Sequence, residues 1–210
     1  MKKIEIFGIT YIEPLDGSTE WYYGSDYAAG DLYEAEEAYR NGYTFEQNRV
    51  LFIHYPDGEV VEPVKAQPNQ YLGRPVFYDG KIINLLVDFS EGEIQILAYD
   101  HESKKQSPIV TLPLTAVKDC YNLLLRTSPI MLTRHNKLFE VIWPERMSYI
   151  VSEREGLYFR DGDKLYFQEW FEDPDYREEL VVRDFHTGEI LERHPGSIRQ
   201  MPDGQNWLLV

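Results

Sequence analysis

The chain has 210 residues, a formal net charge of −15 and a single cysteine, Cys120. This length is enough for one domain with its own core, and the acidic excess would repel nucleic-acid phosphates and an anionic membrane surface. One cysteine forms no internal disulfide, no apolar run approaches the roughly 20 residues of a membrane helix, and the N-terminus lacks a signal-peptide pattern. We therefore expect a cytoplasmic protein whose partners are neither nucleic acid nor membrane.

The N-terminal segment alternates polar and apolar residues over 3–12, and this alternation predicts a strand. Its sequence, IEIFGITYI, would form an exposed edge, and an exposed edge strand can pair with a second copy of the chain. A homo-oligomer is therefore one candidate assembly. Residues 21–27, WYYGSDY, are rich in aromatic side chains and lie outside any clearly alternating segment.

Residues 31–42, DLYEAEEAYRNG, predict the clearest helix of the chain. Asp31 fits the N-cap position, and Glu34 three residues later completes a capping-box pattern. Gly42 suits the left-handed conformation that often follows a helix. A shorter helical turn is predicted over 114–120.

Most of the remaining chain alternates with period two in short segments, which is typical of antiparallel strands. Asp-Gly pairs separate several of these segments and favour hairpins, because glycine adopts positive φ at low cost. The Asp-Gly pairs are at 16–17, 57–58, 79–80, 161–162 and 203–204. The predicted strands are 49–55, 59–64, 74–78, 81–88, 93–99, 108–112, 121–126, 129–133, 137–142, 147–151, 157–160, 164–171, 178–185, 189–193 and 205–209. Residues 64–73 are the best loop candidate.

Two parts of the chain share one plan. VFYDGKIINLLVD (76–88) is echoed by YFRDGDKLYFQEW (158–170), and IQILAYDHESKK (94–105) is echoed by EELVVRDFHTGE (178–189). Each part contains a strand, an Asp-Gly turn, a strand, a loop, a strand, an Asp-x-x-Ser/Thr turn and a last strand. The sequence therefore predicts a repeated antiparallel unit.

This plan resembles one blade of a β-propeller, and the stretches YDGK…AYDHESKK and RDGDK…VRDFHTGE carry the resemblance. It implies a mainly β fold, a small four-bladed propeller-like ring with one short helix; the alternative is a β-sandwich or a distorted barrel of hairpins. The chain also resembles uncharacterised short bacterial proteins, a resemblance that implies no activity. We expect a single domain, 1–210, with repeat-like units near 48–68, 74–112, 121–151 and 157–209.

No motif assigns a catalytic residue. A Gly-x-Ser-x-Gly elbow and the glycine-rich phosphate loops are missing, and Asp119 disfavours a thiolate at Cys120. The five histidines lack the spacing of metal ligands. The acidic segment 169–179 lacks the EF-hand order and is better interpreted as a solvated hairpin tip. We expect no catalytic residue, cofactor or metal.

Aromatic side chains remain as candidates for binding, because tryptophan and tyrosine stack on sugars and peptides. The candidate ligand-binding residues are Trp21, Tyr22, Tyr23, Tyr27, Trp143 and Trp170. We predict a non-enzymatic interaction or ligand-binding module for a protein or small molecule. The alternative is a carbohydrate-active hydrolase or carbohydrate-binding protein, with carboxylates and aromatic rings at a central cleft.

Overall fold

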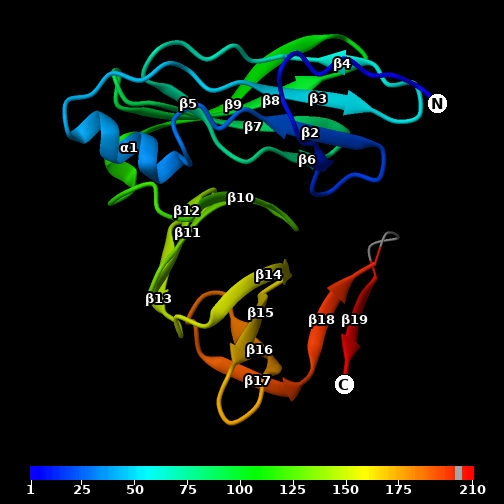
Figure 1. Ribbon diagram of the computed structural model, residues 1–210. Coiled ribbons are helices and arrows are strands. Elements are labelled where there is room, and N and C mark those ends of the chain that lie inside the picture. The colour runs from blue at the N-terminus through cyan, green and yellow to red at the C-terminus, as the bar shows by residue number, and fades with distance from the viewer. Residues whose placement is uncertain (202–204) are drawn as a thin grey trace. The chain divides into compact units, whose positions relative to one another are not determined.

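The computed structural model describes residues 1–201 and 205–210, and it divides into two compact units. Unit 1 is Met1–Thr127 and unit 2 is Ser128–Val210. Antiparallel strands dominate both units, as Figure 1 shows, and the described residues include one α-helix, in unit 1. The Asp-Gly pair predicted to form a turn at 203–204 lies outside the described residues. The prediction of a single domain stays a prediction.

The first sheet of unit 1 has the strand order β1-β2-β3-β4. Its strands are β1 (Glu13–Pro14), β2 (Trp21–Ser25), β3 (Val50–His54) and β4 (Val60–Val61). Successive side chains of a strand point to opposite faces, so Tyr23 and Phe52 enter the main core of unit 1. Leu51 and Ile53 lie on the other face, where they pack against the N-terminal segment.

The predicted strand over 3–12 is wrong. Only Glu13–Pro14 pairs with β2, and the residues before it form no ladder. Ile4, Ile6 and Ile9 instead pack as an irregular segment against the first sheet. The packing of these isoleucines explains the apolar pattern without strand pairing. The homo-oligomer stays a prediction, but residues 3–12 form no edge strand through which two copies could pair.

The predicted helix is confirmed as α1 (Leu32–Arg40). Its capping box is complete: the Asp31 carboxylate accepts a hydrogen bond from the Glu34 amide at 2.8 Å, and the Glu34 carboxylate accepts one from the Asp31 amide at 2.8 Å. Gly42 follows the helix with φ +82°, the conformation expected there. Ala35 is fully buried, so one side of the helix anchors it to unit 1.

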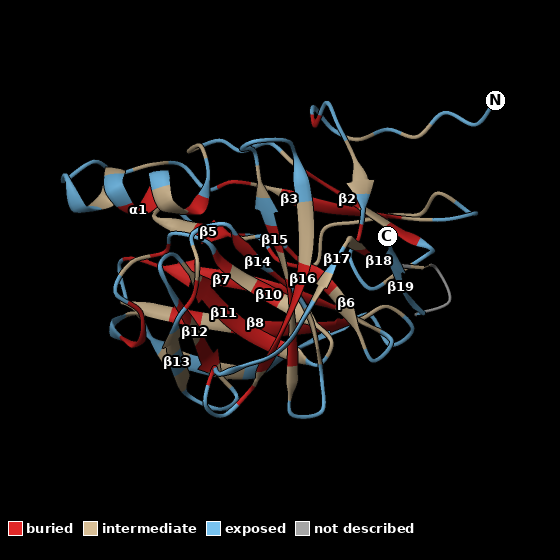
Figure 2. Ribbon diagram, turned by 90° about the horizontal axis from the view of Figure 1, so that it is seen from below, coloured by how far each residue is buried: buried red, intermediate tan, exposed pale blue. Residues whose placement is uncertain are grey.

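The second sheet of unit 1 has the order β5-β7-β8-β9, with β6 also paired to β7. Its strands are β5 (Gln70–Leu72), β6 (Val76–Tyr78), β7 (Lys81–Asp88), β8 (Glu93–Asp100) and β9 (Lys105–Pro113). Figure 2 shows β7 and β8 largely buried, in keeping with their mainly apolar sequences. A 3₁₀ turn, η1 (Leu114–Ala116), follows where a helical turn was expected.

Besides β1, two strands of unit 1 escape the sequence prediction. β2 coincides with the aromatic segment 21–27, and β5 lies inside the expected loop 64–73. Both are short, and neither shows a clean polar–apolar alternation. Their ladder partners, β3 and β7, are the strongly apolar strands beside them.

The third sheet has the order β10-β11-β12-β13, and the boundary between the units follows its first strand. Its strands are β10 (Leu123–Thr127), β11 (Ile130–His135), β12 (Leu138–Trp143) and β13 (Met147–Ile150). In unit 2, Met131 and Phe139 of this sheet join a core with Leu157, Phe167 and Phe185.

The fourth sheet has the order β14-β15-β16-β17, and a separate two-stranded sheet follows it. The strands are β14 (Glu155–Asp161), β15 (Lys164–Phe171), β16 (Arg177–Asp184), β17 (Ile190–Pro195), β18 (Ser197–Gln200) and β19 (Asn206–Leu209). Ile198 of β18 packs against Leu180 and Val182 of β16. β18 is a further strand that the sequence pattern missed.

The two repeated parts of the sequence form the same structure. β6-β7-β8-β9 and β14-β15-β16-β17 are both antiparallel meanders of four successive strands. The Asp-x-x-Ser/Thr turns match as well: Asp100 accepts the Ser103 amide at 2.8 Å, and Asp184 accepts the Thr187 amide at 2.8 Å. The repeat is therefore a structural unit.

The position of the Asp-Gly pair within the turn is shifted by one residue between the two repeats. Asp79 and Gly80 are the two central residues of the β6–β7 turn, and both have positive φ, 49° and 72°. In the other repeat Asp161 already pairs with Lys164, so Gly162 takes the first central position with φ +55°. The same dipeptide thus serves two turn geometries.

The predicted fold class is confirmed: the chain is mainly β, and its described residues form four antiparallel sheets of at least four strands and one α-helix. Successive strands build successive sheets, which is the plan of propeller blades. A closed barrel would instead have one continuous sheet.

Candidate functional site

A cavity of about 240 Å³ lies in unit 1, where α1, β2, β5 and the segment leading into β10 meet. Part of its lining is apolar and includes Leu32, Val50, Leu72 and Leu123. Five tyrosines also line it: Tyr23, Tyr27, Tyr33, Tyr71 and Tyr121. Its charged side chains are Glu13, Asp31 and Arg74. An apolar and aromatic lining with a few polar groups is the usual composition of a small-ligand site.

Two of the tyrosines, Tyr23 and Tyr71, are buried, each 3% exposed. The Tyr23 hydroxyl donates a hydrogen bond to the Glu13 carboxylate, and the Tyr71 hydroxyl donates one to the carbonyl of Gly30. Burial is the main cause that raises the pKa of both phenols, and nearby carboxylates raise it further. Both therefore stay neutral and fixed, which makes them rigid parts of the wall.

The other tyrosines lie nearer the surface. Tyr27 and Tyr121 are 55% and 43% exposed. The ring of Tyr33, on α1, meets Tyr121 edge-to-face with centroids 5.5 Å apart, a favoured aromatic geometry. Tyr27 has φ +50°, an uncommon conformation for a tyrosine. The cavity thus combines a fixed aromatic floor with accessible aromatic rings.

The charged groups of the cavity have structural partners. Arg74 Nη2 lies 3.8 Å from Glu13 Oε2, and the same carboxylate accepts the Tyr23 hydroxyl. Asp31 is the N-cap of α1. The guanidinium of Arg74 therefore lies beside Glu13, whereas Asp31 is held by the N-terminus of α1.

Cys120 lines the cavity without being a nucleophile. It is 2% exposed, and burial first, then Glu36, raises the pKa of its thiol. Its backbone amide donates to Glu36 Oε2 at 2.5 Å, while Arg40 lies 2.6 Å from Glu36 and donates to the carbonyl of Lys118 at 3.0 Å. These bonds attach the segment before β10 to α1 and so fix this side of the cavity.

The six aromatic residues predicted for binding lie in different places. Tyr23 and Tyr27 line the cavity. Trp21 is 4% exposed in the core, with its ring centroid 4.8 Å from those of His54 and His101. Tyr22 packs on the opposite face of β2.

The last two predicted residues belong to unit 2. Trp143 ends β12 and is partly buried. Trp170 lies on β15, is 40% exposed, and has the guanidinium of Arg154 6.0 Å from its ring centroid. Neither is part of the cavity in unit 1. Their assignment to ligand binding stays a prediction.

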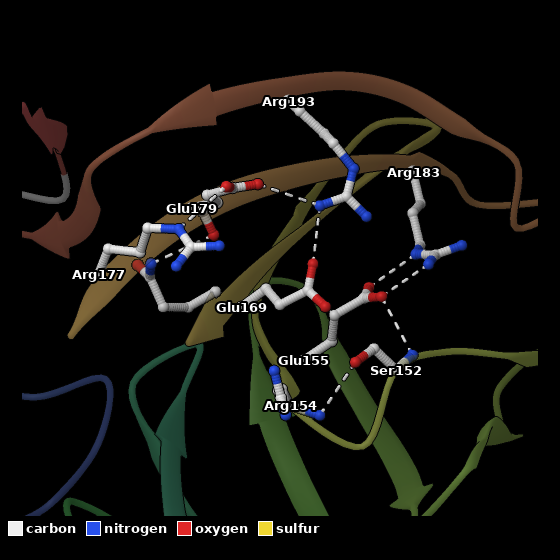
Figure 3. Close-up of polar contacts among 9 residues, drawn as sticks. Ser152, Arg154, Glu155, Glu169, Arg177, Glu179, Arg183 and Arg193 are labelled. Carbon is white, nitrogen blue, oxygen red and sulfur yellow. Dashed lines mark hydrogen bonds and ion pairs between the residues drawn. The ribbon is translucent and has the colours of Figure 1, made fainter. Parts of the chain in front are cut away.

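A second polar cluster lies within unit 2 (Figure 3). Arg183 on β16 forms a bidentate pair with Glu155 on β14, at 2.8 and 2.7 Å, and Glu155 is 2% exposed. Arg193 on β17 lies 2.7 Å from Glu169, the residue opposite Glu155 in the ladder, and 3.2 Å from Glu179. The two buried carboxylates, Glu155 and Glu169, are thus each paired with an arginine, which is the arrangement of a structural cluster.

Comparison of the sequence with models of protein families finds no match, and comparison with curated proteins finds none. The resemblance to short bacterial proteins gains no support from these comparisons.

Two further findings concern the described residues. No group of three or more His, Cys, Asp or Glu side chains in residues 1–201 and 205–210 is placed to hold a metal ion. In the same part of the chain, no helix has both the length and the hydrophobicity to cross a membrane.

Sequence reasoning missed most of the cavity. Tyr33, Tyr71, Tyr121, Glu13 and Arg74 come from separate segments and share no motif. One signal was available: Tyr33 follows the N-cap in a helix that starts directly after the aromatic segment. Only the fold brings the rest of the set together.

Proposed function

We propose that unit 1 is a non-enzymatic binding module whose ligand site is the tyrosine-lined cavity. One observation carries the proposal: five tyrosines, from the aromatic segment, α1, β5 and the segment before β10, line one cavity of about 240 Å³. Aromatic rings supply large contact areas at low cost in conformational entropy. The volume lies below the usual range for drug-sized ligands, so the ligand is a small molecule or one side chain of a partner protein.

The geometry favours binding over hydrolysis. A glycoside hydrolase needs two carboxyl groups about 5–10 Å apart that face the sugar. Glu13 accepts the Tyr23 hydroxyl and lies beside Arg74, and Asp31 caps α1. Both carboxylates therefore have structural partners, and the buried thiol of Cys120 is a poor nucleophile. No observation favours the hydrolase alternative.

The setting of this module follows from composition. A net charge of −15 supports partners other than nucleic acid or anionic membranes. A single cysteine, buried and unpaired with any other, supports a reducing, cytoplasmic environment. The blade-like sheets and the likeness to short bacterial proteins do not identify a ligand, because a fold alone does not define one.

The test uses tyrosine ring signals in NMR spectra of the full chain, with a set of small cationic, anionic, neutral aromatic and sugar fragments as probes. A binding fragment shifts the ring signals of Tyr27, Tyr33 and Tyr121 and raises the melting temperature. The variant Tyr121→Ala weakens binding about tenfold, because it removes an accessible wall of the cavity. The matched control is Tyr43→Ala, at a tyrosine that is 69% exposed and lies outside the cavity.

Two results would overturn this proposal. One is a screen in which no fragment shifts the cavity tyrosines. The other is a fragment whose affinity falls equally in Tyr121→Ala and Tyr43→Ala, because binding would then take place elsewhere.

A further inference from the structure

The charges around the cavity are mainly negative. Glu13 and Asp31 line it, and Arg74 is the lining residue that opposes them. Two further carboxylates, Asp26 and Glu34, join Asp31 in raising the pKa of the buried Tyr71 hydroxyl beyond the effect of burial. Four carboxylates therefore act on the cavity or on its floor. A ligand with negative charge would enter against this field.

The N-terminus of α1 adds no site for an anion. Free amides at a helix N-terminus attract negative groups, and α1 begins at the cavity. Here the amide of Glu34 donates to the Asp31 carboxylate, and the Asp31 amide donates to the Glu34 carboxylate. The chain thus fills this end of the helix with its own carboxylates.

The positive charge of Arg74 does not outweigh the negative charge of the carboxylates around the cavity. Its side chain is 54% exposed, and its guanidinium lies 3.8 Å from Glu13. Solvent and Glu13 together screen this charge. The carboxylate of Asp31 has no arginine beside it among the contacts of the described residues.

The faces of the tyrosine rings also favour a cation. The face of an aromatic ring carries partial negative charge and attracts cations, above all alkylated ammonium groups enclosed by several rings. Tyr33 and Tyr121 meet edge-to-face, and Tyr23 and Tyr71 form the buried floor. The aromatic rings and the carboxylates therefore both favour a positively charged ligand. A volume of about 240 Å³ fits a small cationic group.

We infer that the cavity binds an alkylammonium group, between the rings of its tyrosines and beside the carboxylate of Asp31. This inference rests on the proposed function, because it assigns a ligand class to the same cavity. The group can belong to a free amine or to the lysine side chain of a partner protein. Both sources present the same chemistry to the tyrosines.

The deciding experiment compares two probes of equal shape. Choline carries a trimethylammonium group, and 3,3-dimethyl-1-butanol carries a neutral tert-butyl group in its place. We expect choline to shift the ring signals of Tyr27, Tyr33 and Tyr121 and to bind about tenfold more tightly than the alcohol. Added salt should weaken the binding of choline and leave that of the alcohol unchanged.

One variant separates charge from helix capping. Asparagine caps a helix about as well as aspartate, so Asp31→Asn keeps α1 and removes a negative charge from the cavity. Choline should bind about threefold more weakly to Asp31→Asn, since one nearby Coulomb interaction is lost. The affinity for 3,3-dimethyl-1-butanol should not change.

A second pair of probes distinguishes the sources of the cation. Nα-acetyl-lysine methylamide represents a protein side chain, and its Nε-acetylated form is the neutral control. Tighter binding of the lysine probe than of choline assigns the site to a protein partner, and the reverse order assigns it to a free amine.

The inference and the proposed function fail in different ways. If the alcohol binds as tightly as choline at the same tyrosines, the cavity is a binding site without preference for cations, and the inference is overturned alone. If anionic fragments shift the tyrosines and cations do not, the inference is also wrong. If no probe shifts these tyrosines, the proposed function itself is overturned.

Discussion

The two units of this chain use polar side chains in opposite ways. In unit 2, buried Glu155 meets Arg183 through two hydrogen bonds, and Arg193 lies beside Glu169. In unit 1, polar groups surround a cavity whose lining is mainly tyrosine and apolar. In unit 2 the buried carboxylates of Glu155 and Glu169 are each paired with an arginine, whereas the polar groups that line the cavity of unit 1 leave space beside them.

This difference decides where function is sought. Burying an ion pair removes both charges from water, and this desolvation offsets much of their Coulomb attraction. Loss of one member leaves the other buried and unpaired. A cavity lined by aromatic rings keeps contact surface for a ligand. The cluster of unit 2 has more charge, but the cavity of unit 1 is the better site. Changes in the first should therefore alter stability, and changes in the second should alter binding.

The largest effect is expected in the cluster of unit 2. Glu155→Gln leaves the guanidinium of Arg183 buried without its carboxylate, and the free energy of unfolding should fall by about 3–5 kcal/mol. Urea denaturation followed by the fluorescence of the tryptophans measures this change. The double variant Glu155→Leu with Arg183→Met should recover much of the loss, because it leaves no unpaired buried charge.

An exposed ion pair on the same sheet is the control. Lys164 and Glu192 lie 2.9 Å apart, and both side chains are 45% exposed. Glu192→Gln should change the free energy of unfolding far less than Glu155→Gln, since solvent screens the pair. If Glu155→Gln costs no more than Glu192→Gln, the cluster of unit 2 is not the structural element that its burial indicates.

A smaller effect is expected at the edge of the cavity in unit 1. Asp31→Ala removes the N-cap of α1, and the free energy of unfolding should fall by about 1 kcal/mol. Asp31→Asn should leave stability nearly unchanged, because the amide side chain also caps. Urea denaturation of both variants checks the pair, and an equal loss in the two would show that the charge, and not the cap, stabilises the helix.

Much of the fold could be predicted from the sequence, because its signals are local. Asp-Gly pairs between apolar runs located the hairpins at 79–80 and 161–162, and the capping residues located α1. The N-terminal segment shows the limit of this reasoning. Its isoleucines are buried or partly buried against a sheet, and such packing gives a pattern that resembles that of a paired strand.

The cavity could be predicted only in part. Tyr23 and Tyr27 stand out in the aromatic segment, but the same segment contains Trp21, which fills the core. Tyr71 and Tyr121 become neighbours of these residues only through tertiary contacts. No spacing in the sequence encodes such a set, so composition pointed to aromatic binding without locating it.

The smallest effect concerns a feature that the two units share. Asp100 in unit 1 and Asp184 in unit 2 end equivalent strands, and backbone amides donate to both carboxylates. These hydrogen bonds, first those from the amides of Ser103 and Thr187, lower the pKa of each carboxyl below its ordinary value of 3.8. A carboxyl with a lowered pKa stabilises the folded state above pH 3.8, and this contribution is lost as the pH falls through the folded-state value.

The two turns should therefore titrate alike although they belong to different units. NMR titration of the carboxyl carbons should give a midpoint below 3.8 for both Asp100 and Asp184. In Thr187→Ala the Asp184 carboxylate loses a hydroxyl donor at 3.0 Å and keeps the backbone amide. Its midpoint should rise slightly, and that of Asp100 should not move. A midpoint at or above 3.8 for either residue would show that the two turns, although similar in sequence, do not hold their carboxylates in the same way.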